Sequence, residues 1–254
     1  MPTEANAPLV SAATGAEIKP SGVEVPVRVA PAVGAVPPTL ADHSLWGEVA
    51  AVLAVGVLPN LVSAVSLLLH AYKPAPYWLE ALQLILLSAC TIFVTLYLIG
   101  RSGETWGRFG LSRPRVWDVV LGVGMFLAAI IVYLFRCGLM IPDSAPSILP
   151  SPAPHGPLGL ILMTLKWGAS AFSEELVTRA YLITRLEVLL GSRGTAVLAS
   201  TALFASYHVY QGVAGVEVAT AFGLTYGCAY LLFRRIWPLA IGHALTNLRL
   251  DLMA

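Results

Sequence analysis

Long apolar runs separated by short polar segments fill the chain from about residue 44 onward. These runs lie at about 45–69, 77–99, 116–135, 158–190, 195–208, 216–233 and 237–252. A helix that crosses a membrane needs about 20 mostly apolar residues, and several of the runs have that length. The pattern therefore predicts an all-α fold, a polytopic transmembrane helix bundle of about seven spans.

The first 43 residues differ from the rest, because Ala, Pro and Val are mixed there with scattered charges. They lack a basic segment followed directly by an apolar core, which a cleaved signal peptide would have. We expect residues 1–43 to form a flexible tail and residues 44–254 to form the transmembrane domain. In the first apolar run, Pro59 and Asn60 predict a kink.

Arginines cluster in the segment 101–115, where they are interleaved with Trp106, Phe109 and Leu111. This mixture is typical of a segment at the membrane surface, and an ordinary cytoplasmic loop has the same composition. Alternate loops place most Lys and Arg residues on the side that holds this segment, the N-terminal tail and 185–193. Because basic loops stay in the cytoplasm, we expect a cytoplasmic N-terminus and an outside C-terminus.

Composition supports a membrane location, since 57% of the residues are hydrophobic and only 11% are charged. A soluble domain carries about 25% charged residues. The Ala-, Pro- and Gly-rich chain suggests a bacterial inner (cytoplasmic) membrane protein with multiple spans. No basic cluster suggests nucleic acid binding, and the three widely spaced cysteines form neither a CxxC motif nor a disulfide framework.

Three ionisable residues interrupt the apolar run that begins near Leu158, within the stretch Ala-Phe-Ser-Glu-Glu-Leu-Val-Thr-Arg. Each costs about 3 kcal/mol at bilayer depth and marks a site or a partner. Glu175 and Arg179 have the spacing of a helical ion pair that supports the site. Glu174 points about 100° away and suits general base and acid work near neutral pH; a hydrogen-bonded structural acid is the alternative.

Two later helices carry histidines at helical spacing. Phe204 and His208 are four apart, as are His243 and Asn247, so each pair shares one helix face. A single membrane histidine usually has a packing or hydrogen-bonding role, but two on separate helices, together with Glu174, favour a catalytic site. Counting from the expected helix ends places Glu174 near mid-bilayer, His208 towards the outer half and His243 towards the cytoplasmic side.

Motifs of other membrane proteases are missing from the sequence. No His-Glu-x-x-His supports a zincin-like site, and no Gly-x-Gly-Asp supports an aspartyl intramembrane protease. The segment 168–171, Gly-Ala-Ser-Ala, resembles the Gly-x-Ser of a rhomboid-type serine protease, with His208 or His243 as its base. Small residues in this order are also common where membrane helices pack closely.

The order and spacing of three motifs resemble the CAAX-protease and bacteriocin-processing family of intramembrane proteases, the CPBP or Abi family. The motifs are Glu174-Glu175-x-x-x-Arg179, Phe204-x-x-x-His208 and His243-x-x-x-Asn247. The resemblance covers residues 157–252, whose four helices would form the catalytic core. Ala180 stands where many members have Gly.

What the resemblance implies is an endopeptidase that hydrolyses a peptide bond of a membrane-associated protein or peptide substrate. Glu174 would activate the water with help from His208, and His243 and Asn247 would stabilise the oxyanion. Glu175, Arg179 and Phe204 would support this constellation.

The spacing of the three motifs does not decide whether the reaction needs a metal ion. One possibility is a metal-free glutamate mechanism. The other is metal-assisted hydrolysis, with zinc as the expected ion and Glu174, His208 and His243 as its ligands.

Two non-proteolytic functions compete with the protease prediction. A non-catalytic immunity or scaffold protein of the same fold would keep the helices and need no catalytic Glu174. A transporter could use the membrane carboxylates as a proton relay, but the sequence shows no internal repeat to support it. The expected partners are therefore the lipid bilayer and a peptide or protein substrate within it.

Overall fold

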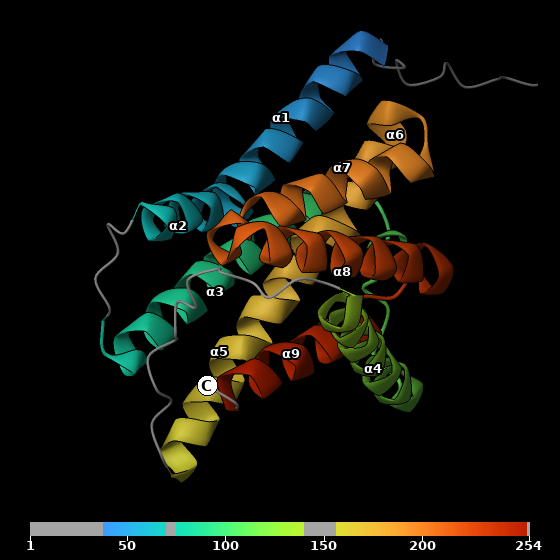
Figure 1. The fold of residues 1–254 in the computed structure, drawn as a ribbon. Coiled ribbons are helices and arrows are strands. Elements are labelled where there is room, and N and C mark those ends of the chain that lie inside the picture. Colours follow the sequence, from blue (N-terminus) through green and yellow to red (C-terminus); the bar gives the residue numbers. More distant parts are fainter. Residues whose placement is uncertain (1–37, 70–74, 140–155, 253–254) are drawn as a thin grey trace, which may run out of the picture. The chain divides into compact units, whose positions relative to one another are not determined.

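The computed structural model describes residues 38–69, 75–139 and 156–252, and helix is the only regular structure in them (Figure 1). Its α-helices are α1 (Pro38–Gly56), α2 (Leu58–Leu68), α3 (Tyr77–Arg101), α4 (Val116–Leu139), α5 (Pro157–Glu175), α6 (Thr184–Leu190), α7 (Arg193–Ser206), α8 (Gly212–Phe233) and α9 (Trp237–Leu252). The predicted all-α, polytopic helix bundle is confirmed. Residues 1–37, which hold most of the predicted tail, lie outside the described part.

The number of membrane spans depends on helix length. Within the described residues, α3, α4 up to residue 135 and 209–233 are long and apolar enough to cross a membrane, and α1 with α2 makes a fourth if the bent pair is one span. By contrast, α7 and α9 have 14 and 16 residues, fewer than a straight crossing needs. The expectation of seven spans stays a prediction.

The first apolar run is bent by 41° between α1 and α2. Pro59 has no backbone N–H, so it leaves the carbonyl of Val55 without its helical partner. The hydroxyl of Thr91 on α3 donates to that carbonyl at 2.9 Å. The side-chain amide of Asn60 donates to the carbonyl of Gly56 at 2.9 Å. The predicted kink is therefore present, and polar side chains satisfy the backbone groups that it exposes.

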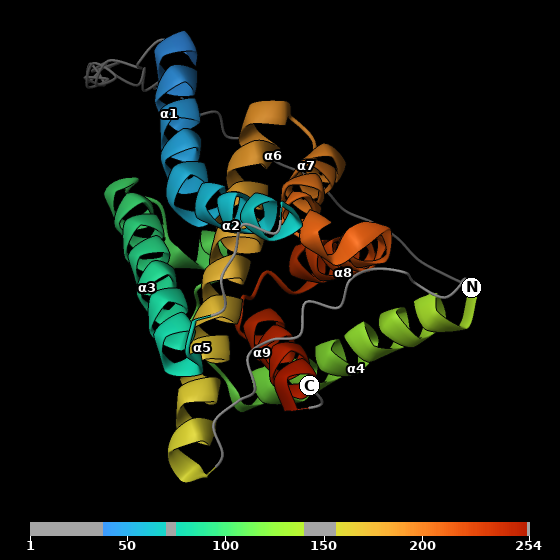
Figure 2. The ribbon, with the colours of Figure 1, turned by 60° about the vertical axis from the view of Figure 1, so that its left-hand side comes forward.

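The fourth apolar run forms one continuous helical rod with an unusual middle. After α5 the backbone widens into a π-helix over Leu176–Ile183 and returns to α-geometry in α6. All eight π-helical residues are buried. Figure 2 shows α5 between α3 and α9, and both helices pack against it. The rod is thus the central element of the domain.

The expectation that residues 185–193 form a basic loop is wrong for Arg185. This residue lies on α6 and is only 2% exposed. Its guanidinium is 2.9 Å from Glu104 and 3.5 Å from Glu48, and it stacks over the ring of Phe109 at 5.0 Å. Phe109 itself is fully buried, while Trp106 is exposed. The aromatic residues of 101–115 therefore divide between the core and the surface.

A buried polar clasp joins α3, α5 and α9. One oxygen of Asp251 lies 3.0 Å from Nζ of Lys166 and accepts hydrogen bonds from Tyr77 and Trp167, each at 2.8 Å. The ammonium of Lys166 also lies 4.2 Å from each of the two ring centroids. This clasp holds the start of α3 and the end of α9 against α5.

Candidate active site

Glu175 is the buried hub that connects two of the three motifs. Its Oε1 lies 3.1 Å from the guanidinium of Arg179 and 2.8 Å from Nδ1 of His243. Glu175 is fully buried and Arg179 is 1% exposed. The ion pair expected from the sequence is present, and it reaches a histidine 68 residues further along the chain.

The π-helical segment starts directly after Glu175 and positions Arg179. π-Geometry inside a helix is rare and occurs mostly at functional sites. The guanidinium of Arg179 lies 4.4 Å from the ring centroid of Phe204, and Thr178 accepts a hydrogen bond from it at 2.6 Å. Its charge is thereby held between a carboxylate and an aromatic face.

His208 lies in a turn just beyond α7, because that helix ends at Ser206. Phe204 and His208 are nevertheless in contact, as their spacing of four residues predicted. Nδ1 of His208 is 2.8 Å from the carbonyl oxygen of Phe204. A carbonyl can only accept, so Nδ1 carries the proton and Nε2 of the neutral ring is an acceptor. The ring centroids of Phe204 and His208 lie 4.7 Å apart, and the two ring planes are tilted by 42°.

Glu174 differs from its neighbour in both burial and partners. It is half-buried, its Oε1 accepts a hydrogen bond from Ser170 at 3.0 Å, and its Oε2 accepts one from Tyr207 at 3.2 Å. These partners are neutral hydroxyls, whereas Glu175 faces charged or ionisable groups. The two adjacent carboxylates therefore have different environments, as their rotation around the helix predicted.

Asn247 follows His243 by one helical turn on α9 and is half-buried. Among the described residues, its side chain makes no hydrogen bond, so its amide remains available to a ligand.

The three motifs converge around Phe204, which is 2% exposed. Its ring centroid lies 4.7 Å from that of His208, 6.2 Å from that of His243 and 4.4 Å from the guanidinium carbon of Arg179. Helix counting placed His208 and His243 at different depths, yet the rings of both histidines lie within 6.2 Å of the ring of Phe204.

The sequence did not predict the two partners of Glu174, Ser170 and Tyr207, as contacts of this carboxylate. Ser170 precedes it by four residues, so helical spacing could have identified that contact. Tyr207 stands next to His208, but its contact with Glu174 depends on the turn after α7. The rhomboid-like alternative gains no support, since the contact that Ser170 makes is with Glu174 and not with a histidine.

The proposed zinc ligands do not fit a metal in this arrangement. In the described part of the chain, no three His, Cys, Asp or Glu side chains are placed to hold one metal ion. Nδ1 of His208 and Nδ1 of His243 contact protein acceptors and leave each Nε2 free, but these atoms and the carboxylate of Glu174 are not grouped closely enough to hold one ion.

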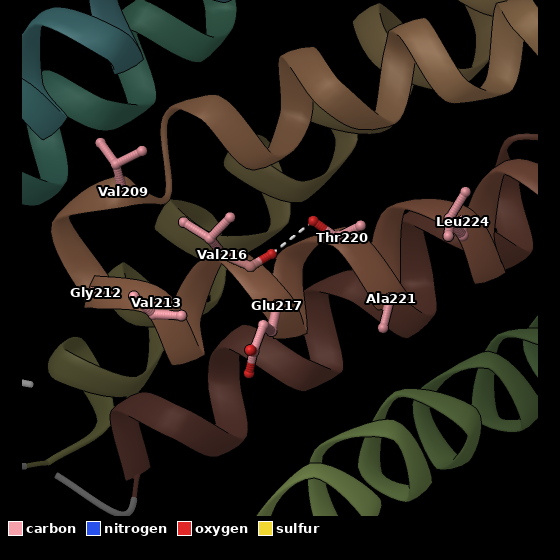
Figure 3. A pocket seen from close by; sticks show the side chains of 8 residues that line it. All are labelled: Val209, Gly212, Val213, Val216, Glu217, Thr220, Ala221 and Leu224. Carbon is pink, nitrogen blue, oxygen red and sulfur yellow. Dashed lines mark hydrogen bonds between the residues drawn. The ribbon is translucent and has the colours of Figure 1, made fainter.

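Two hollows lie near these residues. A small polar chamber between α2, α3 and α5 is bounded by Glu174. A wider groove of about 640 Å³ runs along α8 from Val209, the neighbour of His208, to Leu224 (Figure 3). Its walls are mainly apolar and include Glu217. Glu174 lines the chamber and does not line the groove.

The C-terminal part of the chain matches a known protein family. Residues 156–249 match the family model described as type II CAAX prenyl endopeptidase Rce1-like. The matched segment runs from the start of α5 into α9 and contains all three motifs. Neither the curated proteins nor the solved structures gave a match to the chain.

Proposed function

We propose that this chain is an intramembrane endopeptidase that uses Glu174 to activate water, since residues 156–249 match a model of the CPBP family of membrane proteases. The observation that carries this proposal is the contrast between two adjacent carboxylates. Glu175 is fully buried against Arg179 and His243, while Glu174 faces a polar chamber.

Proton transfer in this mechanism starts at Glu174. A carboxylate next to a water can take its proton as the water attacks a peptide carbonyl, and then give that proton to the leaving amine. The acceptor Nε2 of His208 would assist by sharing the proton that Glu174 takes. Ser170 and Tyr207 hold the carboxylate in one orientation through both of its oxygens.

Stabilisation of the oxyanion falls to His243 and Asn247. Because Nδ1 of His243 donates to Glu175, Nε2 can donate to an oxyanion only when the ring is doubly protonated. The carboxylate of Glu175 stabilises that charged ring as it stabilises Arg179. The amide of Asn247 supplies a second donor, and such donors contribute about 2.7–4 kcal/mol each to catalysis.

The proposed substrate is a membrane-associated protein or peptide, processed by a protein of a bacterial inner membrane whose N-terminus is cytoplasmic. Because the matching family is that of type II CAAX prenyl endopeptidases, a farnesylated Cys-aliphatic-aliphatic-X peptide is the first probe. An unbiased library of membrane peptides is the second.

The decisive experiment is cleavage of these probes by purified protein and by its Glu174→Gln variant, with products identified by mass spectrometry. Loss of a general base lowers the rate about 10²- to 10⁴-fold. Glu217→Gln, another acid in a candidate span, is the matched control and should cleave normally. Cleavage by Glu174→Gln at the wild-type rate would refute the proposal.

A non-catalytic immunity or scaffold role makes the opposite prediction. Such a protein would bind its partner equally well before and after the Glu174→Gln substitution, because only the shape of the helices would matter. Partner binding that is indifferent to this substitution, without any cleavage by the wild type, would favour that role.

A further inference from the structure

The chamber beside Glu174 is built largely by residues outside the matched family segment. α2 contributes Asn60, α3 contributes Ser88 and Thr91, and α5 contributes Ser170 and Glu174. Figure 2 shows these three helices next to one another. The space open to the centre of a water molecule is about 10 Å³, close to the lower limit for one buried water.

Most polar groups around the chamber already have protein partners. Thr91 donates to the carbonyl of Val55, and Ser173 donates to that of Ser170. The amide nitrogen of Asn60 donates to Gly56. These bonds shape the wall and use the hydroxyl hydrogens of Thr91 and Ser173, so neither hydroxyl can donate to a ligand.

Three groups remain able to bind a water. Ser88 is 3% exposed, and within the described residues its hydroxyl has no hydrogen-bond partner. Asn60 keeps its carbonyl oxygen, since only its nitrogen is engaged. Glu174 has further lone pairs beyond those that accept from Ser170 and Tyr207. A buried water makes about three hydrogen bonds, and the chamber supplies one donor and two acceptors.

We propose that Asn60 and Ser88 hold a single water molecule against Glu174, and that this is the water that Glu174 activates. This inference rests on the proposed function. The water donates one hydrogen to Glu174 and the other to the carbonyl oxygen of Asn60, and it accepts from Ser88. One lone pair of its oxygen remains for attack on the peptide carbonyl.

The reaction balances with these groups alone. Glu174 takes a proton from the water while the oxygen forms a bond to the carbonyl carbon. When the C–N bond breaks, Glu174 returns the proton to the leaving amine. Asn60 and Ser88 act through the water and are therefore positioning residues, and the N-terminal helices complete a site whose motifs all lie C-terminal to them.

The test compares variants that change polarity at constant size. Ser88→Thr and Ser88→Val have nearly the same volume and differ in the hydroxyl, so we expect kcat to be about fivefold higher with Thr, the effect of one hydrogen bond. Asn60→Leu should lower kcat about tenfold for the same reason, with KM unchanged. Ser63→Ala, an exposed position on α2, is the control.

A double variant separates water positioning from simple packing. Since either substitution alone releases the water, Asn60→Leu combined with Ser88→Val should lower kcat no further than the worse single variant. Thermal unfolding in detergent must show that each variant is folded. Additive losses, equal kcat for Ser88→Thr and Ser88→Val, or a raised KM alone would overturn the inference. If Glu174→Gln is itself active, the proposed function fails first and independently.

Discussion

Nδ1 of His243 lies 2.8 Å from Oε1 of Glu175, a contact that fixes α9 to the centre of the α5–α6 rod. The same carboxylate oxygen faces Arg179 at 3.1 Å. Oε2 of Glu175 and one guanidinium nitrogen of Arg179 are buried without a hydrogen-bond partner among the described residues. The carboxylate of Glu175 therefore accepts from Arg179 and His243 at the same time. Removing this carboxylate would leave both side chains buried without their acceptor.

Breaking this pair should destabilise the fold strongly. Arg179→Met leaves Glu175 buried without its main counter-charge, which costs about 3–5 kcal/mol, and Glu175→Gln should have a similar effect. The double variant should lose much less than the sum of the two, because neither charge is then left alone. Chemical unfolding in detergent measures all three.

A surface pair supplies the control for that cycle. Arg108 and Glu104 are 3.3 Å apart, and the side chain of Arg108 is 47% exposed. Arg108→Met should change stability by less than about 1 kcal/mol. If Arg179→Met has an equally small effect, the buried pair is not a support of the site.

Much of this hub was predictable from the sequence, and part of it was not. Helical spacing alone pairs Glu175 with Arg179, and the motif order brings His243 into the same site. The contact between His243 and Glu175 depends on how α9 packs against α5, which no local pattern records. Likewise, α7 ends at Ser206 although apolar residues continue to Val209, because tertiary contacts of the turn outweigh helix propensity there.

The chamber shows the same limit more clearly. The sequence predicted a kink at Pro59 and Asn60 but no functional role for either residue. That role arises only because the bend turns α2 towards Ser88 and Glu174, residues far apart in the chain. The motifs identify the acid, while the surrounding helices decide what it faces.

The contact between Tyr207 and Glu174 should contribute to turnover. Tyr207→Phe removes a hydroxyl that lies 3.2 Å from Oε2, and loss of one hydrogen bond worth about 1 kcal/mol lowers kcat about fivefold. KM should stay the same, because Tyr207 orients the base and need not bind substrate. Steady-state kinetics on a peptide that the wild type cleaves will measure both constants.

Tyr210→Phe is the matched control, since its hydroxyl accepts a hydrogen bond from Gln211. It should leave kcat unchanged. Equal losses in Tyr207→Phe and Tyr210→Phe would mean that the hydroxyl on Glu174 has no special effect.

Close packing of α4 against α9 should make Gly242 intolerant of a side chain. A Cβ there would lie 2.7 Å from Cβ of Met125 and 2.9 Å from the carbonyl oxygen of Gly122, and backbone cannot move cheaply. Overpacking costs about 1–3 kcal/mol, and His243 is the next residue. Gly242→Ala should therefore lower both the melting temperature and the cleavage rate, whereas Gly124→Ala, which meets no atom within 4 Å, should lower neither.

Acid pH should weaken the end of α6. Burial alone would raise the pKa of Glu187, but hydrogen bonds from Arg193 and Arg234 hold that pKa below its usual value of 4.5. A depressed folded-state pKa contributes stability above pH 4.5, and this contribution disappears as the pH falls through the folded value. For such a partly exposed group it is worth roughly 0.5 kcal/mol.

Thermal unfolding between pH 6 and pH 3 measures this contribution. The difference in melting temperature between wild type and Glu187→Gln should be about 1–2 °C at pH 6 and should shrink as the pH falls below 4.5. A difference that stays constant over this range would show that Glu187 acts through packing and not through its charge.

The metal content of the purified protein decides between the two catalytic schemes. Nδ1 of His208 and of His243 face the carbonyl of Phe204 and the carboxylate of Glu175, and Glu174 accepts from two hydroxyls. Because no three His, Cys, Asp or Glu side chains of the described residues are placed to hold one metal ion, we expect cleavage that resists chelators and less than one zinc per chain by elemental analysis. Glu174→Ala and His208→Ala should leave the metal content unchanged while abolishing cleavage. Near-stoichiometric zinc that falls in both variants, with activity lost to chelators, would instead require that the three side chains rearrange around a metal ion.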